Sequence, residues 1–316
     1  MNYLLAAVVA FGIVYIAVPV LRAIALQTGF VDRPSSRKIH TVPIPLLGGG
    51  AIYIGIVASF FLFQGITNLS ITVAVGGLLL VTIGLIDDRA KTKGKEFPVW
   101  PRVIVYAAAS FIPAATGIRI SGVTDPGPGL MFIFPEWVSV SATVVWVFAL
   151  INMINFIDGV DGLASGVATL SSSTLFITAL VKGQLEIALL AVILVGSCIA
   201  FLVYNFYPAR IFMGDAGATF LGYTLAVIAV EGAFKSATLV TMAVPLLALG
   251  LPIMDTVIVM TRRLISGRGL HRADKLHAHH LLMRWGLNQV QTVSFLYLIA
   301  ALFSLLSIVI LFVVRN

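Results

Sequence analysis

Two amides and two carboxylates stand close together in the segment from Asn152 to Asp161, between two long apolar runs. A carboxylate at the depth of a bilayer costs roughly 2.5–3.5 kcal/mol on an insertion scale, so such groups are rarely accidental. Asn152 and Asn155 are spaced i and i+3, which places both amides on one face of a helix that ends here. The glycine that follows each aspartate favours a break, so Asp158 and Asp161 are predicted to lie on a loop.

Three more carboxylates stand at the ends of apolar runs. Asp87 and Asp88 are adjacent at the end of one run. Helix capping needs only one aspartate, and adjacent carboxylates repel, so the pair predicts a site where a cation or a proton is handled. Asp215 follows Gly214 and opens another run. On its own it is typical of a helix N-cap; together with Asn155 it is a candidate ligand for Mg²⁺, which prefers carboxylate and amide oxygens.

Basic residues and histidines form two further clusters. The segment after the first apolar run holds Lys38 and His40 and ends in three consecutive glycines. Membrane topology alone predicts basic residues there, and a phosphate-binding loop is the functional alternative. Near the end of the chain, His277, His279 and His280 lie within four residues. Zinc is disfavoured because the single cysteine lies inside an apolar run and the other candidate ligands are oxygens, so a phosphate-binding cluster is predicted.

The composition determines the class of protein that must position these residues. Of 316 residues, 59% are hydrophobic and 10% are charged, against about 25% charged in a soluble domain. Apolar runs recur from end to end, each long enough to cross about 30 Å of hydrocarbon. We therefore predict an all-α polytopic membrane protein in which residues 1–316 form a single integral-membrane domain. The ten predicted transmembrane helices cover residues 3–26, 46–64, 71–86, 101–118, 138–155, 164–182, 187–205, 216–233, 238–260 and 289–314.

The distribution of charge predicts how these helices are oriented. Sixteen of the 20 Lys and Arg residues fall in alternate loops, which the positive-inside rule assigns to the cytoplasm. Both termini are then outside, and the first run, which no basic segment precedes, is a span rather than a signal peptide. All five histidines, and all aspartates except Asp125 and Asp255, fall at the cytoplasmic side. An active site on the cytoplasmic face is predicted, and the dispersed basic residues argue against a nucleic-acid partner.

Taken in order, the motifs read Asp-Asp, Asn-x-x-Asn-x-x-Asp-Gly-x-Asp-Gly, Phe-Met-Gly-Asp-x-Gly and His-x-His-His. This set resembles the polyprenyl-phosphate N-acetylhexosamine-1-phosphate transferases (glycosyltransferase 4, or MraY-like) over residues from about 30 to 285. The likeness is strongest to the WecA/TagO branch, which uses UDP-GlcNAc, because the UDP-MurNAc-pentapeptide branch has three contiguous histidines. The segment from Asp32 to His40 is most similar to the TagO-like enzymes that start wall teichoic acid, whereas Ala278 departs from the larger residues often seen there.

The resemblance implies a reaction, a cofactor and a set of roles. Enzymes of this family join a sugar-1-phosphate from a UDP-sugar to a lipid phosphate and release UMP, with Mg²⁺, for which Mn²⁺ can substitute. Here it implies transfer of GlcNAc-1-phosphate from UDP-GlcNAc to undecaprenyl phosphate, the first membrane step of a cell-envelope polymer such as wall teichoic acid. Asp215 and Asn155 then hold the metal, and Asp87, with Asp88 beside it, deprotonates or orients the lipid phosphate. The implied substrate-binding residues are Lys38, His40, Asn152, Asp158, Asp161, His277, His279 and His280.

The expected partners are the two substrates and the bilayer of the bacterial cytoplasmic membrane, which the chain crosses many times; a homodimer remains open. Another UDP-N-acetylhexosamine is the nearest alternative substrate. A proton- or cation-coupled transporter is the alternative from another class, but a transport path needs polar groups through the membrane midplane. Here they stop near one face, with Asp255 the deepest. The motifs leave open both direct attack and an aspartyl-phosphate intermediate.

Overall fold

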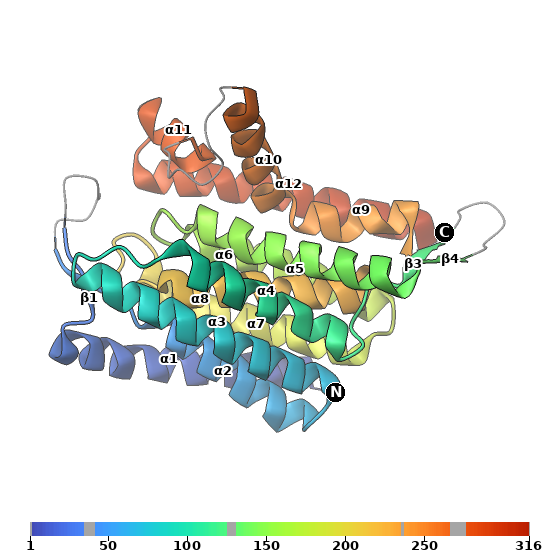
Figure 1. Ribbon diagram of the computed structural model, residues 1–316, viewed down its shortest axis with the longest axis horizontal. Coiled ribbons are helices and arrows are strands. Elements are labelled where there is room, and N and C mark those ends of the chain that lie inside the picture. The colour runs from blue at the N-terminus through green and yellow to red at the C-terminus, as the bar shows by residue number, and fades with distance from the viewer. Residues whose placement is uncertain (1, 35–41, 125–130, 235–236, 266–275, 316) are drawn as a thin grey trace.

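The computed structural model describes residues 2–34, 42–124, 131–234, 237–265 and 276–315. Long helices lie side by side and make up most of these ranges (Figure 1). In chain order the helices are α1 (Tyr3–Thr28), α2 (Gly48–Gln64), α3 (Asn68–Thr92), α4 (Val99–Ala115), α5 (Glu136–Ile157), α6 (Leu163–Val181), α7 (Leu185–Asn205), α8 (Gly214–Ala229), the π-helical turn η1 (Val230–Phe234), α9 (Leu239–Ala248), α10 (Gly250–Ile265), α11 (Ala278–Arg284) and α12 (Gln289–Arg315). The short strands within these ranges are β1 (Val31–Asp32), β2 (Ile44–Pro45), β3 (Gly122–Thr124), β4 (Met131–Ile133) and β5 (Ala237–Thr238).

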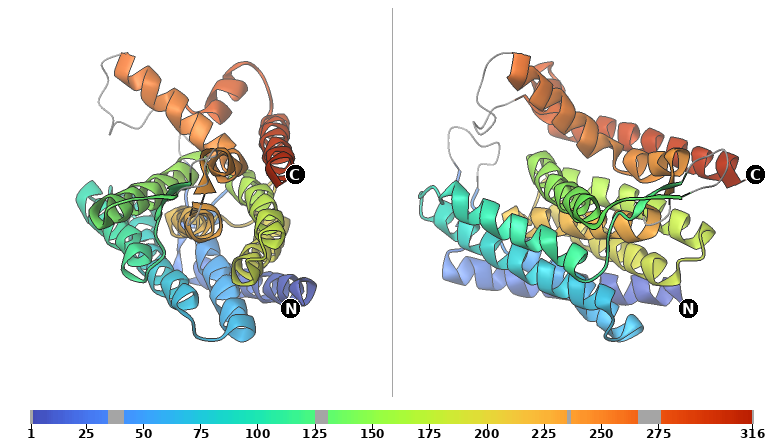
Figure 2. Two further views of the ribbon diagram at one scale, coloured as in Figure 1. Left: turned by 90° about the vertical axis from the view of Figure 1, so that its right-hand side faces the viewer. Right: turned by 45° about the vertical axis from the view of Figure 1, so that its right-hand side comes forward.

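Helix α8 lies at the centre of the bundle. Every residue from Ala216 to Ala229 is buried, and the end-on view in Figure 2 shows the helix enclosed by its neighbours. A helix that is apolar on all sides needs such an enclosed position. Its first residue, Gly214, has a φ of +65°, which glycine adopts without steric cost. The chain can therefore turn sharply into α8, and Asp215 lies on the first turn of this central helix.

Glycines let two helices approach α8 closely. A Cβ atom at Gly84 of α3 would clash with the backbone of Ala216, and one at Gly49 of α2 would clash with the backbone of Gly217. Such close backbone approach is a recognised use of glycine. Because Gly84 lies about one turn before Asp87, the approach brings the acidic end of α3 against the start of α8.

Several of the described helices suit a membrane. Six are long and apolar enough to cross one (α1, α3, α5, α6, α7 and α12), and a seventh span is counted if α9 and α10 cross as a unit. The prediction of an all-α protein with several membrane-compatible helices is confirmed. The span predicted over 238–260 is divided in the structure, where α9 and α10 are bent by 79° at the break between them. Ten spans remain a proposal, since α2, α4 and α8 have only 17, 17 and 16 residues.

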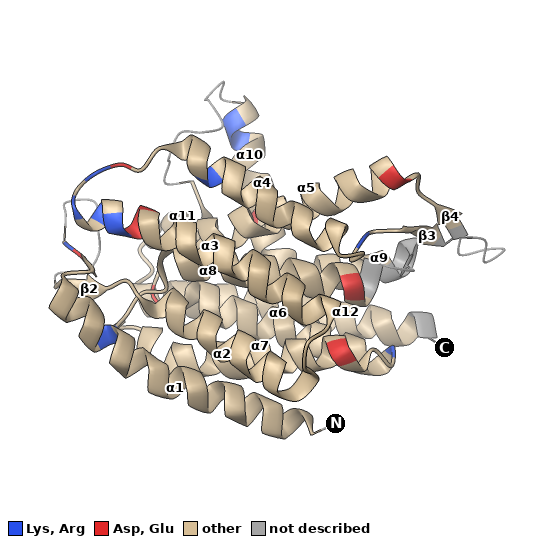
Figure 3. Cartoon of the chain, turned by 60° about the horizontal axis from the view of Figure 1, so that its bottom comes forward, with Lys and Arg blue, Asp and Glu red and all other residues tan. Residues whose placement is uncertain are grey.

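The two ends of the bundle differ in charge. Both termini lie at one end in Figure 1, near the sheet in which β3 pairs with β4 and β5. Strands β1 and β2 pair with each other at the opposite end. Most Lys and Arg residues in Figure 3 also lie toward that opposite end, which is termed the basic end below. This separation agrees with the charge distribution predicted from the sequence.

Helices α9, α10 and α12 form a layer on one side of the bundle (Figures 1 and 2). Helix α12 packs against α9 and α6, and α10 contacts α5. The short helix α11 lies at the basic end beside α12. The layer therefore places α11 at the same end of the bundle as the acidic end of α3.

Candidate active site

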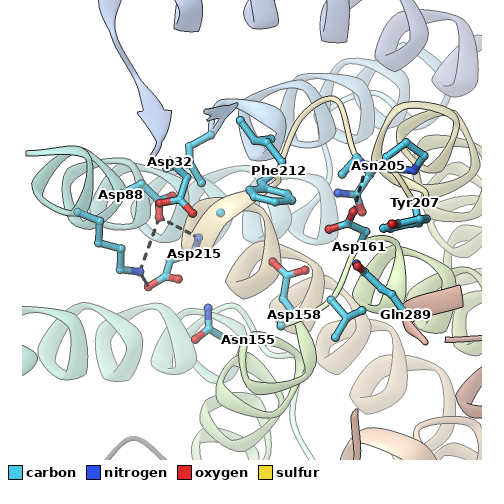
Figure 4. Close-up of a pocket in the computed structure, with 18 of the residues that line it drawn as sticks. Asp32, Asp88, Asn155, Asp158, Asp161, Asn205, Tyr207, Phe212, Asp215 and Gln289 are labelled. Atoms are coloured by element: carbon cyan, nitrogen blue, oxygen red, sulfur yellow. Dashed lines mark hydrogen bonds and ion pairs between the residues drawn. The ribbon is translucent and has the colours of Figure 1, made fainter. Parts of the chain in front are cut away.

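A cavity of about 530 Å³ opens at the basic end (Figure 4). Its wall is formed by the end of α3, the loop between α5 and α6, the segment from the end of α7 to the start of α8, and the strands β1 and β2. The polar side chains that line it include Asp32, Asp88, Lys91, Asn155, Asp158, Asp161, Asn205, Tyr207, Asp215, His280 and Gln289. Carboxylates from four separate parts of the chain thus line one cavity.

Three carboxylates at this cavity share one lysine. Oxygen atoms of Asp87, Asp88 and Asp215 lie within 4.8 Å of one another. The Nζ atom of Lys91 lies 2.7 Å from Asp87 Oδ2 and 2.8 Å from Asp215 Oδ2. Asp88 Oδ1 lies 3.8 Å from the same nitrogen. Arg102 adds a second cation, with Nη1 3.4 Å from oxygen atoms of Asp87 and Asp215. The cluster therefore combines three negative with two positive side chains.

Asp88 also holds the start of α8 in place. Its Oδ1 atom accepts a hydrogen bond from the Asp215 N–H group at 3.2 Å, and its Oδ2 atom accepts one from the Ala216 N–H group at 3.4 Å. The first N–H groups of a helix have no partner within the helix, so an acceptor there caps it. Asp88 is 1% exposed. This carboxylate of α3 therefore caps α8 and fixes Asp215 relative to α3.

The donor set of the cluster fits a hard divalent cation. The candidate ligands are oxygen atoms of Asp87, Asp88 and Asp215, and Asn155 lines the same cavity with its amide. Cations such as Mg²⁺ take carboxylate and amide oxygens. The single cysteine of the chain, Cys198, is buried in α7 and does not line this cavity. The cluster is thus compatible with a divalent metal ion, as the sequence predicts.

Hydrogen bonds join the loop between α5 and α6 to the segment after α7. Asp161 Oδ2 accepts a bond from the Ala209 N–H group at 3.0 Å. Asn205 Oδ1 accepts a bond from the Gly162 N–H group at 3.1 Å, and its Nδ2 atom donates to the Ile211 carbonyl at 3.0 Å. Because Asn205 is 3% exposed, these bonds are shielded from water. They hold two walls of the cavity together.

Asp158 follows the last turn of α5 and points into the cavity in Figure 4. Burial raises its pKa well above the usual range, and the carboxylates of Asp215 and Asp88 raise it further. The group therefore keeps its proton to higher pH than an exposed aspartate does. In that form it can donate a hydrogen bond to an anionic ligand.

Asp158→Asn is expected to raise the melting temperature of the metal-free protein at neutral pH. In the unfolded chain an aspartate ionises near pH 4, whereas in the fold Asp158 ionises only at higher pH. The folded state then binds the extra proton, so this group lowers the free energy of unfolding as pH rises above about 4. A neutral amide removes that loss. The measurement is thermal unfolding in detergent with a chelator, at pH 7.5 and near pH 4.5.

The gain from Asp158→Asn should shrink toward pH 4.5. Asp161→Asn is the matched control, because that carboxylate accepts the Ala209 hydrogen bond and no stabilisation is expected from its loss. A lower melting temperature for Asp158→Asn at pH 7.5 would contradict the prediction.

The three clustered histidines occupy different environments. His280 lines the cavity. His279 is 2% exposed and lies against Gly159, and its Nε2 atom has no hydrogen-bond partner among the described residues. Burial, together with the neighbouring His280, lowers the pKa of His279 to about 3. The His279 ring is therefore neutral at physiological pH and supplies no charge to a phosphate. His277 bonds to Asp255 and does not line the cavity.

The structure brings some of the predicted residues together and leaves others apart. Those that line the cavity are Asp88, Asn155, Asp158, Asp161, Asp215 and His280. Asp87 joins them through Lys91. Asn152 does not line the cavity, because its amide donates to the Phe148 carbonyl at 2.7 Å, one turn earlier in α5. Lys38 and His40 lie outside the described residues.

Sequence reasoning missed several residues of the site, among them Lys91, Asn205 and Arg102. Lys91 carries a signal, since a helix continuing past Asp87 places it at i+4, on the same face. Asn205 carries a weaker one, as an amide that closes an apolar run in the way Asn155 does. Arg102 carries none, because it lies on the next helix, α4, and reaches the carboxylates only through the packing of α4 beside α3.

Comparisons with known proteins show to which family the sequence is related. The model of glycosyl transferase family 4 matches residues 70–233, more than half of the chain. A probable undecaprenyl-phosphate N-acetylglucosaminyl 1-phosphate transferase of Bacillus subtilis (strain 168) is 35% identical over 303 residues, covering 96% of this chain and 83% of that protein. An undecaprenyl-phosphate alpha-N-acetylglucosaminyl 1-phosphate transferase of Yersinia pestis is 31% identical over 297 residues, covering 92% and 79%.

A third relative is named for a different polyprenyl phosphate. A decaprenyl-phosphate N-acetylglucosaminephosphotransferase of Mycobacterium leprae (strain TN) is 29% identical over 320 residues, covering 90% of this chain and 78% of that protein. The relatives differ in the polyprenyl chain that they are named for and share N-acetylglucosamine in their names. The family model covers more than half of the chain, and the Bacillus subtilis relative is 35% identical over 96% of it. The chain therefore belongs to glycosyl transferase family 4.

Proposed function

We propose that this protein transfers GlcNAc-1-phosphate from UDP-GlcNAc to undecaprenyl phosphate and releases UMP. The observation that carries the proposal is the convergence of Asp87, Asp88, Asp215 and Asn155 with two cationic side chains at one cavity. The names of the relatives support the sugar and the lipid. The other parts of the proposal are Mg²⁺ as the metal, ten spans with the cavity on the cytoplasmic face, and the bacterial cytoplasmic membrane as the location.

The reaction joins two anions, which explains the charges at the cavity. An oxygen atom of the lipid phosphate attacks the phosphorus that carries the sugar, and the bond from that phosphorus to the UMP oxygen breaks. The electron pair of the broken bond leaves with UMP. Such a displacement needs alignment of the reacting atoms and neutralisation of their charge. Lys91 and Arg102 supply positive charge beside the carboxylates, and a bound Mg²⁺ supplies more.

Each residue of the cluster is assigned a role according to its place in the fold. Asp215 and Asn155 hold the metal at the start of α8 and the end of α5. Asp87, at the end of α3, orients or deprotonates the lipid phosphate. Asp88 fixes the start of α8 relative to α3, because its carboxylate accepts hydrogen bonds from the N–H groups of Asp215 and Ala216. Asp158 binds the nucleotide-sugar as a hydrogen-bond donor, consistent with its raised pKa.

The sugar is the part of the proposal that a single assay tests most directly. Purified protein with undecaprenyl phosphate and Mg²⁺ is expected to release UMP from UDP-GlcNAc and not from UDP-MurNAc-pentapeptide. The reason is the His-x-His-His pattern of residues 277–280, which resembles the UDP-GlcNAc branch and differs from the three contiguous histidines of the other branch. The measurement is UMP release together with mass spectrometry of the lipid product, over a panel of UDP-sugars. Asp215→Asn protein in the same detergent is the control for contaminating activity.

Two outcomes bear on different parts of the proposal. Preference for UDP-GalNAc or for the pentapeptide substrate would overturn the sugar and leave the reaction class. Release of no UMP from any UDP-sugar, by folded protein supplied with lipid phosphate and metal, would overturn the reaction class itself. If the product is a polyprenyl diphosphate sugar, we propose that it enters a cell-envelope polymer, wall teichoic acid being the first to examine.

A further inference from the structure

Asp255 is a buried carboxylate that the proposed reaction does not use. It lies on the second turn of α10, among the buried residues of that helix, and is 3% exposed. An ionisable side chain inside a membrane helix is expected to have a specific partner. Both oxygen atoms have one: Oδ2 lies 2.6 Å from His277 Nδ1, and Oδ1 accepts a hydrogen bond from the Ala278 N–H group at 2.7 Å.

These bonds fasten the start of α11 to α10. Asp255 and His277 are 22 residues apart in the chain. Helix α11 has only seven residues, and a helix of that length is not stable by itself in water. Its place therefore depends on contacts with other elements, which include the bonds to Asp255 and the packing against α12.

The fastened segment continues into the cavity. The His277 ring is parallel to the His279 ring within 8°, with centroids 6.0 Å apart. His279 lies against Gly159, in the loop that carries Asp158, and leaves no room there for a Cβ atom. The next residue, His280, has its ring centroid 4.2 Å from that of His279 and lines the cavity. One line of contacts thus runs from α10 through α11 to the cavity wall.

We propose that Asp255 is a positioning residue of the active site: through His277 and the Ala278 N–H group it sets α11, so that His279 supports the Gly159 loop and His280 faces the bound substrate. The proposal rests on the proposed function for its kinetic consequences. It does not make Asp255 a catalytic residue, because the carboxylate does not line the cavity. The orientation of the two later histidines is what it controls.

The kinetic test compares Asp255→Ala, His277→Ala and the double variant. Each is expected to lower kcat/KM for UDP-GlcNAc by about 10–100-fold, as loss of an outer-shell partner commonly does, with KM for undecaprenyl phosphate unchanged. The double variant should be no worse than the more affected single variant, because both act through one linkage. Asp255→Asn keeps an acceptor for Ala278 and should recover part of the loss. It also serves if Asp255→Ala does not fold.

Ser307→Ala is the matched control. It removes another buried hydrogen bond of the same layer, from Ser307 Oγ to the Val244 carbonyl at 2.8 Å, which joins α12 to α9 away from the cavity. A purely structural role predicts that Asp255→Ala and Ser307→Ala lower the melting temperature alike and leave kcat/KM unchanged. That result would overturn the inference.

Hydrogen exchange separates the inference from the proposed function. In Asp255→Ala, amides 277–284 and 158–163 should exchange faster than in the unaltered protein, and in Ser307→Ala they should not. This holds even if UDP-GlcNAc proves to be the wrong substrate. Unchanged exchange in both segments would reject the positioning role, whereas faster exchange in a protein that releases no UMP would reject only the proposed function.

Discussion

Asp215→Asn is expected to lower turnover by about 10²–10³-fold, the loss typical when one preorganised electrostatic group is removed from an active site. The residual activity should also need a higher Mg²⁺ concentration. Asp215 lies on the first turn of α8, where Asp88 holds its backbone N–H group. Mg²⁺ requires oxygen ligands at about 2.0–2.1 Å in near-octahedral geometry, so a neutral amide at this fixed position weakens the site. The measurement is UMP release as a function of Mg²⁺.

Asp87→Asn is the comparison that separates metal from lipid phosphate. It should also lose turnover, yet still bind UDP-GlcNAc in a Mg²⁺-dependent way, because Asp87 is assigned to the other substrate. Both carboxylates contact the Lys91 ammonium group, at 2.7 and 2.8 Å, so each variant removes one partner of the same lysine. Equilibrium binding of the nucleotide sugar at several Mg²⁺ concentrations distinguishes them. Loss of that binding in Asp87→Asn, with retention in Asp215→Asn, would reverse the two assignments.

Much of the architecture follows from apolar runs and helix breakers. The ranges of apolar residues locate the long helices, and the glycines after Asp158 and Asp161 end α5 and place both carboxylates on a loop, as predicted. The bend between α9 and α10 was not predicted, although Gly250 and Pro252 mark it. Both residues weaken a helix locally. In a continuously apolar run, hydropathy alone does not distinguish a straight span from a broken one.

Site residues at the ends of helices could be predicted from the sequence. Site residues that are brought in by the packing of one helix against another could not. Asp87, Asp88, Asn155 and Asp215 stand at the ends of apolar runs, which meet at one end of a bundle. Arg102 could not be predicted as a site residue, because nothing in the sequence shows that α4 packs beside α3 at that height. The partner of Asp255 was equally hidden, since bonds between residues so distant in the chain depend on how α11 folds back.

The structure gives Asp88 and His279 surroundings that differ from those their sequence motifs suggest. Asp88 stands beside Asp87 in the sequence, and the pair suggests shared chemistry, but the structure gives Asp88 the backbone N–H groups of Asp215 and Ala216 as partners. His279 belongs to a motif that suggests phosphate binding. Its burial against Gly159 lowers the pKa of the ring to about 3, which favours the neutral form. Adjacency in sequence therefore overstated how alike neighbouring polar side chains are.

Lys91→Met is expected to destabilise the metal-free protein and to increase its response to Mg²⁺. The Lys91 ammonium group contacts Asp87 and Asp215, and Asp88 lies 3.8 Å away. Without it, three carboxylates within 4.8 Å of one another lose their closest cation. Breaking a fully buried ion pair costs roughly 3–5 kcal/mol; the loss here should be smaller, because the Lys91 side chain is 42% exposed and screened by water.

Magnesium and the lysine ammonium group should compete for the same carboxylates. A ligand that binds only the folded state raises the free energy of unfolding by mass action, and in Lys91→Met no ammonium group has to be displaced first. Mg²⁺ should therefore raise the melting temperature of Lys91→Met more than that of the unaltered protein, and at lower concentration. Lys93→Met is the matched control, since Lys93 is exposed two residues further on and has no ion pair within the described part of the chain. Equal Mg²⁺ responses in all three proteins would show that the metal binds without displacing Lys91, and would contradict the predicted competition.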